Sequence, residues 1–490
     1  MPYKNEYLRG EFPIRPAINK HLEEEAFMQR DLTQGKILPV LIRFSIPFLI
    51  SSFLQTFYGL ADLFITGQFY GAAEITAVSV GSQIMHMVTL IIVGLSMGAT
   101  ISISHEMGTL SGKINRAEDP DCKRTYGHIA EILGNAILLF IGIAIVLLGI
   151  LVGLRSPVLM ALRTPTESLE SAKAYLTIVA LGIPAIAGLN VVSGVFRGMG
   201  DSRTPMYFVA VSGVLNIGLD NLFMGPFGLG AAGAALATVI AQVFSVFLAV
   251  LTLIRKNPGI HLKRADFRLN SGITNKMLHI GAPIALQDGL IQISFLVITA
   301  IANNRGVDIA AAVGIVEKMI SFIFLVPSAM LSTVSDISAQ NVGAGKYDRT
   351  RETLRIGILI CLGFGFVIAV LVQFLAPVTM SWFTGDPEVI TYGAEYFRTY
   401  VLDCMIAGVH FCFSGFFTAY GKSSYAFIHN MISVIAVRIP GAYLTSMWFP
   451  STLLPMGAAA PLGSLVSVII CIYFYKRLKR AGFALQLHTR

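Results

Sequence analysis

FLQTFYGLADLFITG, residues 53–67, is an apolar run that contains one acid, Asp62. A second run, FVAVSGVLNIGLDNLF at residues 208–223, carries Asp220 in the same way. Both runs suit a helix that crosses a lipid bilayer, where an ionised carboxylate is costly. Acids at that depth usually mark an ion pathway, so the two aspartates predict a transporter driven by protons or sodium ions.

The composition of the whole chain agrees with a membrane protein. Hydrophobic residues make up 54% and charged residues 13% of the 490 residues, and the mean hydropathy is +0.70. Soluble domains carry about 25% charged residues. The net charge is +8, but the basic residues cluster between the hydrophobic runs, which is the pattern of membrane topology. We therefore expect contact with the lipid bilayer and no nucleic-acid partner.

The chain contains twelve hydrophobic segments, each long enough for the roughly 20 residues that a spanning helix needs. They predict an all-α membrane protein with twelve transmembrane helices. Several segments exceed the minimum length, so we expect tilting or extension beyond the bilayer. The segments lie near residues 38–66, 75–107, 127–153, 171–196, 206–224, 231–254, 277–301, 309–340, 353–376, 393–419, 425–449 and 457–475.

The loops between these segments indicate the orientation in the membrane. Every second loop is basic, and the opposite loops are short and poor in Lys and Arg, apart from Arg155, Arg163 and Arg305. Basic loops stay in the cytosol, so both termini are expected there, in a polar tail of residues 1–36 and a second tail of residues 477–490. The first tail lacks the features of a signal peptide.

The chain also repeats itself. SGVFRGMGDSRTP at residues 193–205 is similar to SGFFTAYGKSSYA at residues 414–426. The repeat predicts two lobes of six helices, an N-lobe of residues 37–254 and a C-lobe of residues 277–476, joined by a cytosolic linker of residues 255–276. An even number of helices per repeat gives both lobes the same orientation. Two such lobes would enclose a cavity that rocking exposes to alternate sides.

Four stretches, taken in order over the two repeats, resemble the multidrug and toxic compound extrusion (MATE) family. They are residues 32–84, 195–223, 230–242 and 338–349, and the resemblance covers nearly all of the chain after residue 32. Within the family, the chain is similar to the bacterial branch related to the DNA-damage-inducible export proteins. The resemblance implies a V-shaped transporter of a bacterial inner membrane. It implies a monomer that exports organic cations or amphipathic drugs in exchange for H⁺ or Na⁺, without an organic cofactor.

The resemblance also implies a cation-coupling site in the first lobe. Asn216 and Asp220 are four residues apart and share one helix face. Only the resemblance brings that face together with the first helix, because Asp and Asn in a membrane can also simply join helices. The site residues would be Asp62, Asp220, Asn216, Thr238, Tyr58 and Gln55, with Pro47 as a hinge in the first helix.

Such a site has two chemical options. Two carboxyl groups buried close together bind a proton more readily than exposed ones do. Alternatively, oxygens from Asp62, Asn216, Asp220 and Thr238 could coordinate Na⁺, since hard cations prefer oxygen ligands. The residues leave the choice between H⁺ and Na⁺ open, and no other metal site is expected.

The second lobe does not repeat the acid pair. Position 62 corresponds to Val297 or Ile298 and position 220 to Gly441, so we expect coupling in one lobe only. Glu317 and its neighbour Lys318 should point in different directions, and Arg438 could pair with Asp403. The residues that we expect to line the substrate cavity are Asn190, Glu317, Lys318 and Arg438.

Other classes of protein fit the sequence less well. GTLSGKIN at residues 108–115 departs from a phosphate-binding loop, with Ile114 where Ser or Thr is needed, which argues against an ATPase. No HExxH or GxSxG motif stands at a helix end, which argues against an enzyme. The five cysteines form no CxxC pair and are interpreted as small hydrophobic residues. The alternative that stays open is a flippase of the same superfamily that moves lipid-linked oligosaccharide or peptidoglycan precursors.

Overall fold

The computed structural model describes residues 31–113, 120–256, 260 and 262–482, so residues 1–30 of the first predicted tail and residues 483–490 of the second lie outside it. The described chain is helical throughout. Its elements are α2 (Ile37–Phe69), α3 (Ala72–Lys113), α4 (Pro120–Ala161), α5 (Thr166–Leu181), α6 (Ile183–Gly198), α7 (Arg203–Met224), α8 (Gly230–Lys256), η1 (Arg264–Asp266), α9 (Ser271–Asn303), α10 (Val307–Ile323), α11 (Leu325–Gly343), α12 (Tyr347–Ser381), α13 (Pro387–Tyr400), α14 (Leu402–Ala419), α15 (Ser423–Ser433), η2 (Val434–Arg438), α16 (Ile439–Trp448) and α17 (Leu454–Arg480).

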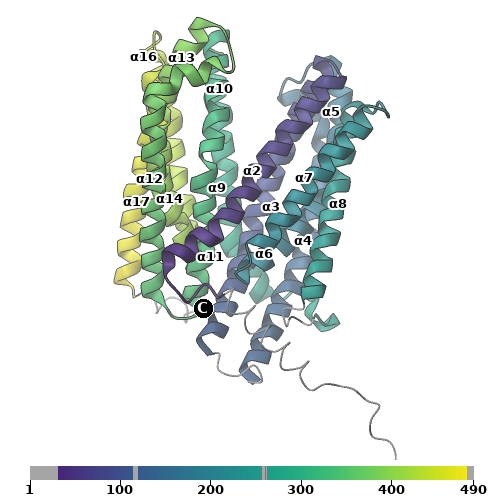
Figure 1. Cartoon of the computed structure of the whole chain (residues 1–490), viewed down its shortest axis with the longest axis vertical. Coiled ribbons are helices and arrows are strands. Elements are labelled where there is room, and N and C mark those ends of the chain that lie inside the picture. The colour runs from purple at the N-terminus through teal and green to yellow at the C-terminus, as the bar shows by residue number, and fades with distance from the viewer. Residues whose placement is uncertain (1–30, 114–119, 257–259, 261, 483–490) are drawn as a thin grey trace, which may run out of the picture.

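The predicted number of spans is confirmed. Within the described chain, eleven helical stretches are long and apolar enough to cross a membrane, and the bent pair α5 and α6 makes a twelfth. Helices α3 and α4 each contain 42 residues, or about 63 Å at 1.5 Å per residue, against a hydrocarbon core of about 30 Å. They extend beyond the other helices at one end of the molecule, as Figure 1 shows.

The helices form two bundles, the N-lobe (α2–α8) and the C-lobe (α9–α17), which stand side by side in Figure 1. Both lobes begin with a helix of 33 residues that contains an internal proline, Pro47 in α2 and Pro283 in α9. Both also end a helix with a glycine in the left-handed region, Gly200 after α6 (φ 86°) and Gly421 after α14 (φ 67°). These matching features confirm the repeat that residues 193–205 and 414–426 predicted.

Four predicted segments are divided in the structure: residues 309–340 at Phe324, residues 393–419 at Val401, and two others at breaks beside a proline. The sequence analysis missed all four divisions. Segment 171–196 is bent by 44° between α5 and α6, where Gly182 is followed by Pro184. Segment 425–449 passes through the π-helical turn η2 directly before Pro440. Proline has no N–H to donate to the residue four positions earlier, so each of these two breaks lies where a helical hydrogen bond is lost.

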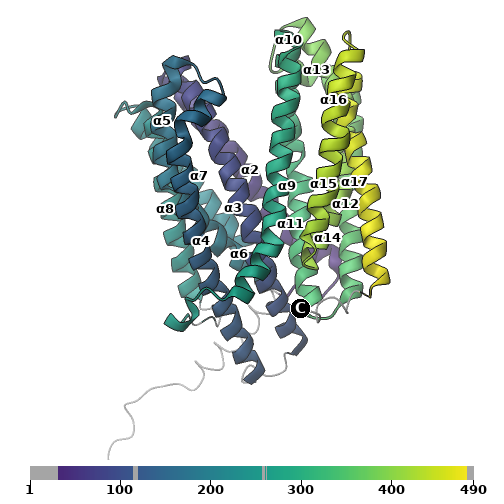
Figure 2. The same cartoon turned by 180° about the vertical axis from the view of Figure 1, so that it is seen from behind.

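The two lobes meet at one end and diverge at the other, which gives the molecule a V shape (Figures 1 and 2). At the end where they meet, α3 of the N-lobe packs against α9 and α11 of the C-lobe. A Cβ atom added to Gly98 would lie 2.1 Å from the carbonyl oxygen of Met277, and one added to Gly343 would lie 2.0 Å from that of His105. Only glycine permits backbones to approach this closely, as is common between membrane helices.

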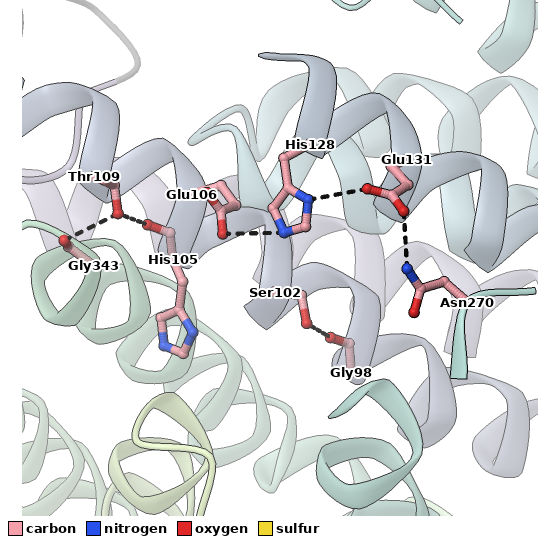
Figure 3. Close-up of polar contacts among 9 residues, drawn as sticks. All are labelled: Gly98, Ser102, His105, Glu106, Thr109, His128, Glu131, Asn270 and Gly343. Atoms are coloured by element: carbon pink, nitrogen blue, oxygen red, sulfur yellow. Dashed lines mark hydrogen bonds and ion pairs between the residues drawn. The ribbon is translucent and has the colours of Figure 1, made fainter. Parts of the chain in front are cut away.

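Hydrogen bonds reinforce this contact between the lobes. The Nε2 atom of His105 lies 2.7 Å from the carbonyl oxygen of Ala419, and the hydroxyl of Thr109 donates to the carbonyl oxygen of Gly343 at 3.3 Å. Figure 3 shows Thr109, His105 and Gly343 at this junction. Because His105 and Thr109 belong to α3, one helix of the N-lobe makes polar contacts with two helices of the C-lobe.

A second polar group at the same end joins α3 and α4 to the segment before α9. The ring of His128 lies 3.7 Å from Glu106 and 3.3 Å from Glu131, measured between nitrogen and carboxylate oxygen. Asn270 donates to Glu131 at 3.0 Å (Figure 3). The connection between the lobes is therefore fastened to the long helices of the N-lobe.

Residues 31–36, here called the strap, connect α2 to the opposite lobe. The backbone N–H of Leu32 donates to Oε1 of Gln340 in α11 at 3.1 Å, and the guanidinium of Arg349 in α12 donates to carbonyls of the strap. The amide nitrogen of Gln340 donates to the carbonyl of Gly198 in the N-lobe at 2.9 Å. Helix α2 thus starts against the C-lobe and crosses to the N-lobe, as Figure 1 shows.

We predict that Gly98→Leu destabilises the protein. The new side chain would collide with the backbone of α9, and overpacking of this kind costs about 1–3 kcal/mol. Thermal unfolding of the purified protein in detergent should occur at a lower temperature than for the wild type. Gly149→Leu in α4, where an added Cβ meets no atom within 4 Å, is the control and should unfold like the wild type. An unchanged unfolding temperature for Gly98→Leu would contradict the tight interlobe contact.

Candidate functional site

The structure brings the two intramembrane acids together inside the N-lobe. Asp62 lies on α2 and Asp220 on α7, they are 6% and 0% exposed, and their carboxyl groups contact each other. One oxygen of Asp62 and both oxygens of Asp220 have no donor among the described residues. Two ionised carboxylates in this contact would repel each other without water to screen them. The pair therefore requires a positive charge, either a proton or a metal cation.

Asn216 extends this group of oxygens along α7. It lies one helical turn before Asp220, is 3% exposed, and its amide nitrogen makes a weak hydrogen bond of 3.4 Å to the hydroxyl of Thr238 on α8. The carbonyl oxygen of its side chain has no donor within the described chain. The four predicted ligands Asp62, Asp220, Asn216 and Thr238 thus converge, and acceptors outnumber donors among them.

The remaining two predicted members differ in their placement. The ring of Tyr58 packs over α7 at Gly213, where an added Cβ would lie 3.2 Å from the ring, and Tyr58 interacts electrostatically with Asp62. Gln55 is exposed and has no hydrogen bond to any residue that the structure describes. Tyr58 therefore borders the acid pair, whereas the structure does not bring Gln55 to it.

A tyrosine that the sequence analysis missed also faces the acids. Tyr175 of α5 is 2% exposed and interacts electrostatically with both Asp62 and Asp220. It lies directly over Gly81 of α3, where an added Cβ would be 2.3 Å from the ring. An aromatic residue in an apolar segment carries no signal of such a role, because most residues of that kind face lipid or other helices.

Glu74 fixes the start of α8 and was also missed. Its carboxylate accepts hydrogen bonds from the backbone N–H of Ala231 at 2.6 Å and from the hydroxyl of Ser171 at 2.5 Å. A carboxylate at a helix N-terminus satisfies free N–H groups and complements the helix dipole. Since Thr238 follows about two turns later on α8, Glu74 helps to hold it opposite Asn216.

A second set of contacts anchors the end of α2 beside the acids. The hydroxyl of Thr66 donates to the carbonyl oxygen of Asp62 at 2.6 Å and contacts the sulfur of Met224 at 3.4 Å. Tyr70 donates to the carbonyl oxygen of Met224 at 2.9 Å. The part of α2 that carries Asp62 is therefore tied to the end of α7 that carries Asp220.

The predicted cavity residues do not form one group. Asn190 donates to the carbonyl of Ile186 in its own helix at 2.8 Å. Glu317 accepts from the hydroxyl of Thr299 at 3.0 Å within the C-lobe. Lys318 is exposed and interacts electrostatically with His86 of α3, so it faces the N-lobe. Glu317 and Lys318 thus point in different directions, as predicted.

Arg438 lies inside the C-lobe rather than between the lobes. Its guanidinium contacts the hydroxyl of Tyr400 and lies 4.8 Å from the centre of the Phe295 ring. Its charge interacts with those of Asp403 and Glu317, so the hypothesis that Arg438 is paired with Asp403 has support as an electrostatic interaction. These contacts use the arginine within its own lobe.

No cluster of three or more His, Cys, Asp or Glu side chains suited to a metal ion occurs in the described part of the chain. Four cysteines are buried as free thiols, and the sulfurs of Cys361 and Cys412 lie 3.8 Å apart. The oxygen-rich group in the N-lobe suits a proton or an alkali cation better than a thiophilic metal.

Comparison with known proteins identifies the family. The sequence profile described as MatE matches residues 47–118, 122–222 and 283–444. The chain belongs to the MATE family. It is therefore a multi-pass membrane transporter and not an enzyme, and the resemblance found from the sequence is confirmed.

Curated relatives cover most of the chain. A probable multidrug resistance protein, YpnP of Bacillus subtilis, is 27% identical over 85% of this chain and 90% of its own length. A protein named FAD transporter from Shewanella oneidensis is 28% identical over 91% of this chain and 96% of its own length. The probable multidrug resistance protein NorM of Thermotoga maritima is 24% identical over 90% of this chain and 91% of its own length.

Solved structures share the fold. The crystal structure of MATE in the bent conformation superposes with a TM-score of 0.83 at 18% identity and covers 92% of this chain and 98% of that one. An outward-facing multidrug resistance MATE transporter of the MOP superfamily gives a TM-score of 0.82 at 19% identity, with 92% and 97% covered. At these identities the likeness concerns the fold, and it confirms two lobes of six helices in a V.

We predict that Glu74→Ala lowers the stability of the N-lobe. Hydrogen bonds to a charged group contribute about 1.5–3 kcal/mol each, and this change removes those to Ala231 and Ser171. The temperature of thermal unfolding should fall. Glu170→Ala, which removes an exposed i,i+3 ion pair with Lys173 on α5, is the control and should change little. Equal unfolding temperatures for the two variants would show that Glu74 does not hold α8.

Proposed function

We propose that the protein is a secondary transporter that exports organic cations or amphipathic drugs in exchange for an inward-moving H⁺ or Na⁺. One observation carries this proposal. Asp62 and Asp220 meet inside the N-lobe, where they and Asn216 present acceptor oxygens without matching donors in the described chain. A cation that binds there and leaves again changes the charge of a buried site, which is the requirement for ion coupling.

Of the two ions, the geometry favours the proton. A single proton on one of two neighbouring buried carboxyl groups removes their mutual repulsion, and Asp62 and Asp220 interact in this way. Sodium would instead need several of the oxygens to surround it at once. Export follows if the ion-loaded site and the empty site favour different arrangements of the lobes. An ion that binds both arrangements with equal affinity would not change their populations.

Helix α2 offers a way for loading to change the shape of the lobe. Pro47 lacks an N–H, so the carbonyl oxygen of Arg43, four residues earlier, loses its helical hydrogen bond. The hydroxyl of Ser51 donates to the carbonyl of Pro47 at 2.9 Å, so the next turn of α2 carries an additional hydrogen bond whereas the turn before Pro47 lacks one. We infer that α2 bends at Pro47 and that this bend moves Asp62 relative to Asp220.

The proposed setting is a bacterial cytoplasmic membrane with both termini in the cytosol and the transporter acting as a monomer. The basic loops lie at the end where the lobes meet, so in this orientation the cytosolic end is closed and the V opens outward. The linker of residues 255–276 and the strap then lie on the cytosolic side.

A flippase for pyrophosphate-linked lipids is less well supported. Such a substrate calls for several free cationic groups between the lobes. Arg438 interacts within the C-lobe with Tyr400, Phe295 and Asp403. Of the two cationic residues proposed for the cavity, Lys318 alone is exposed toward the N-lobe. The relative named FAD transporter shows that substrates of relatives are not all drugs, so FAD belongs among the compounds to be tested.

The deciding experiment uses the full chain in proteoliposomes loaded with a fluorescent cationic dye or with FAD. A pH gradient and a Na⁺ gradient are imposed separately. We expect the pH gradient to drive exchange of the dye. Asp62→Asn should reduce that exchange to the level of vesicles without protein, since the amide cannot bind and release the proton.

Asp308→Asn is the matched control, because Asp308 is exposed in the first turn of α10. It should transport like the wild type. If Asp62→Asn exchanges dye at the full rate and with unchanged dependence on the gradient, the coupling role of the acid pair is wrong. Exchange driven only by Na⁺ would overturn the preference for H⁺, and transport of FAD alone would overturn the substrate class.

A further inference from the structure

Two arginines line one cavity on the outside of the N-lobe. The cavity lies between α2 and α7, has a volume of about 230 Å³, and is bordered by Arg43 and Arg203 together with Pro47 and Tyr207. Arg43 and Arg203 are both exposed, and their side chains have no ion pair or hydrogen bond with any described residue. Two unpaired guanidinium groups at one hollow indicate an anionic ligand, since arginine pairs strongly with phosphate.

The acid next to Arg203 does not neutralise this charge. The carboxylate of Asp201 accepts hydrogen bonds from Lys256 at 3.0 Å and from the hydroxyl of Thr204 at 2.6 Å. Although burial opposes ionisation, the hydrogen bonds from Thr204 and the charge of Lys256 lower the pKa of Asp201. Asp201 therefore stays charged and engaged with Lys256, and the two arginines keep their positive charge uncompensated.

A separate apolar hollow lies farther along α7, on the face that carries Tyr207. Tyr207, Val211, Val214 and Gly218 follow one another at spacings of three or four residues, and Val214 is 75% exposed. Val211, Val214 and Gly218 border a second cavity of about 500 Å³ that reaches toward α8. Figure 1 shows α7 at the front of the N-lobe between α2 and α8. The surface therefore combines a cationic cavity with an apolar groove farther along α7.

This combination matches the shape and polarity of a phospholipid. Arg203 is the first residue of α7 and Arg43 lies in the second turn of α2, so both lie near the ends of their spans, where lipid phosphates are found. The apolar hollow lies deeper, beside the middle of α7. We propose that the groove binds an anionic phospholipid, with its phosphate between Arg43 and Arg203 and an acyl chain along α7 as far as Gly218.

Pro47 borders the same cavity, so a lipid bound there would affect the shape of α2. The carbonyl that Pro47 leaves without a helical partner belongs to Arg43, one of the two phosphate ligands. A lipid held there contacts α2 at the point where it bends most easily. Binding of the lipid should therefore favour one shape of α2 and alter the rate of exchange. This second step rests on the proposed function, whereas the binding step does not.

The test measures binding to the purified full-length protein, so its outcome is independent of transport. Native mass spectrometry after exchange with phosphatidylglycerol or phosphatidylcholine reports the lipid retained. We expect the wild type to retain phosphatidylglycerol preferentially. Arg43→Gln combined with Arg203→Gln should lower its affinity by about thirtyfold, since each basic residue near the surface contributes roughly fivefold. Arg355→Gln combined with Lys476→Gln removes two exposed charges from the C-lobe and should have no effect.

The apolar part of the site is tested by Gly218→Leu. An added Cβ at Gly218 meets no atom within 4 Å, so the fold accommodates the change, while the larger side chain fills the hollow. Retention of phosphatidylglycerol should fall with no change in thermal unfolding. Gly153→Leu on α4, where an added Cβ is equally unhindered, should retain the lipid.

Three results would overturn the proposal. The first is equal retention of phosphatidylglycerol and phosphatidylcholine by the wild type, and the second is full retention by the double arginine variant. The third combines two observations: millimolar inorganic phosphate displaces the lipid, and Gly218→Leu retains phosphatidylglycerol fully. Together they would make the cavity at Arg43 and Arg203 a site for free phosphate. Loss of dye exchange alone would bear on the proposed function and not on lipid binding.

Discussion

Helix α3 packs closely against α9 and α11, and this contact holds the two lobes together at one end of the molecule. Gly98 and Gly343 let the backbones of the two lobes approach to distances that any side chain would prevent. The polar contacts of His105, Thr109 and Gln340 add to this junction. Because these contacts lie at one end of the V, the opposite end can separate without breaking them.

The acid pair imposes the second constraint, which is chemical. Burying Asp62 against Asp220 with Asn216 beside them creates a site that is complete only when a positive charge is present. Tyr175 and Tyr58 interact electrostatically with the pair, and Glu74 holds the helix that carries Thr238. The surrounding residues thus keep the acids in place, as the proposed exchange of an ion at this pair requires.

The sequence was sufficient for the parts of the structure that follow from hydrophobic patterning. The number of spans, the two lobes and the two intramembrane acids could be predicted, because long apolar runs and a repeated motif are visible in the chain itself. The bend at Gly182 and the π-helical turn before Pro440 were missed, since a proline inside an apolar run is compatible with a continuous or a broken helix. Tyr175 and Glu74 were missed because their roles depend on which helices become neighbours. Gln55 was assigned to the site through the family resemblance, but in the structure its side chain is exposed.

Helix α2 has a fixed attachment to each lobe. The strap before it is bonded to Gln340 and Arg349 of the C-lobe, whereas Thr66 and Tyr70 near its other end are bonded within the N-lobe. It therefore links the two lobes, and α2 must bend or tilt whenever one lobe moves relative to the other. Along α2, the turn between Arg43 and Pro47 bends most easily, because it lacks one helical hydrogen bond. This turn lies between the interlobe junction and Asp62, so a displacement at the junction is taken up there before it reaches the acids.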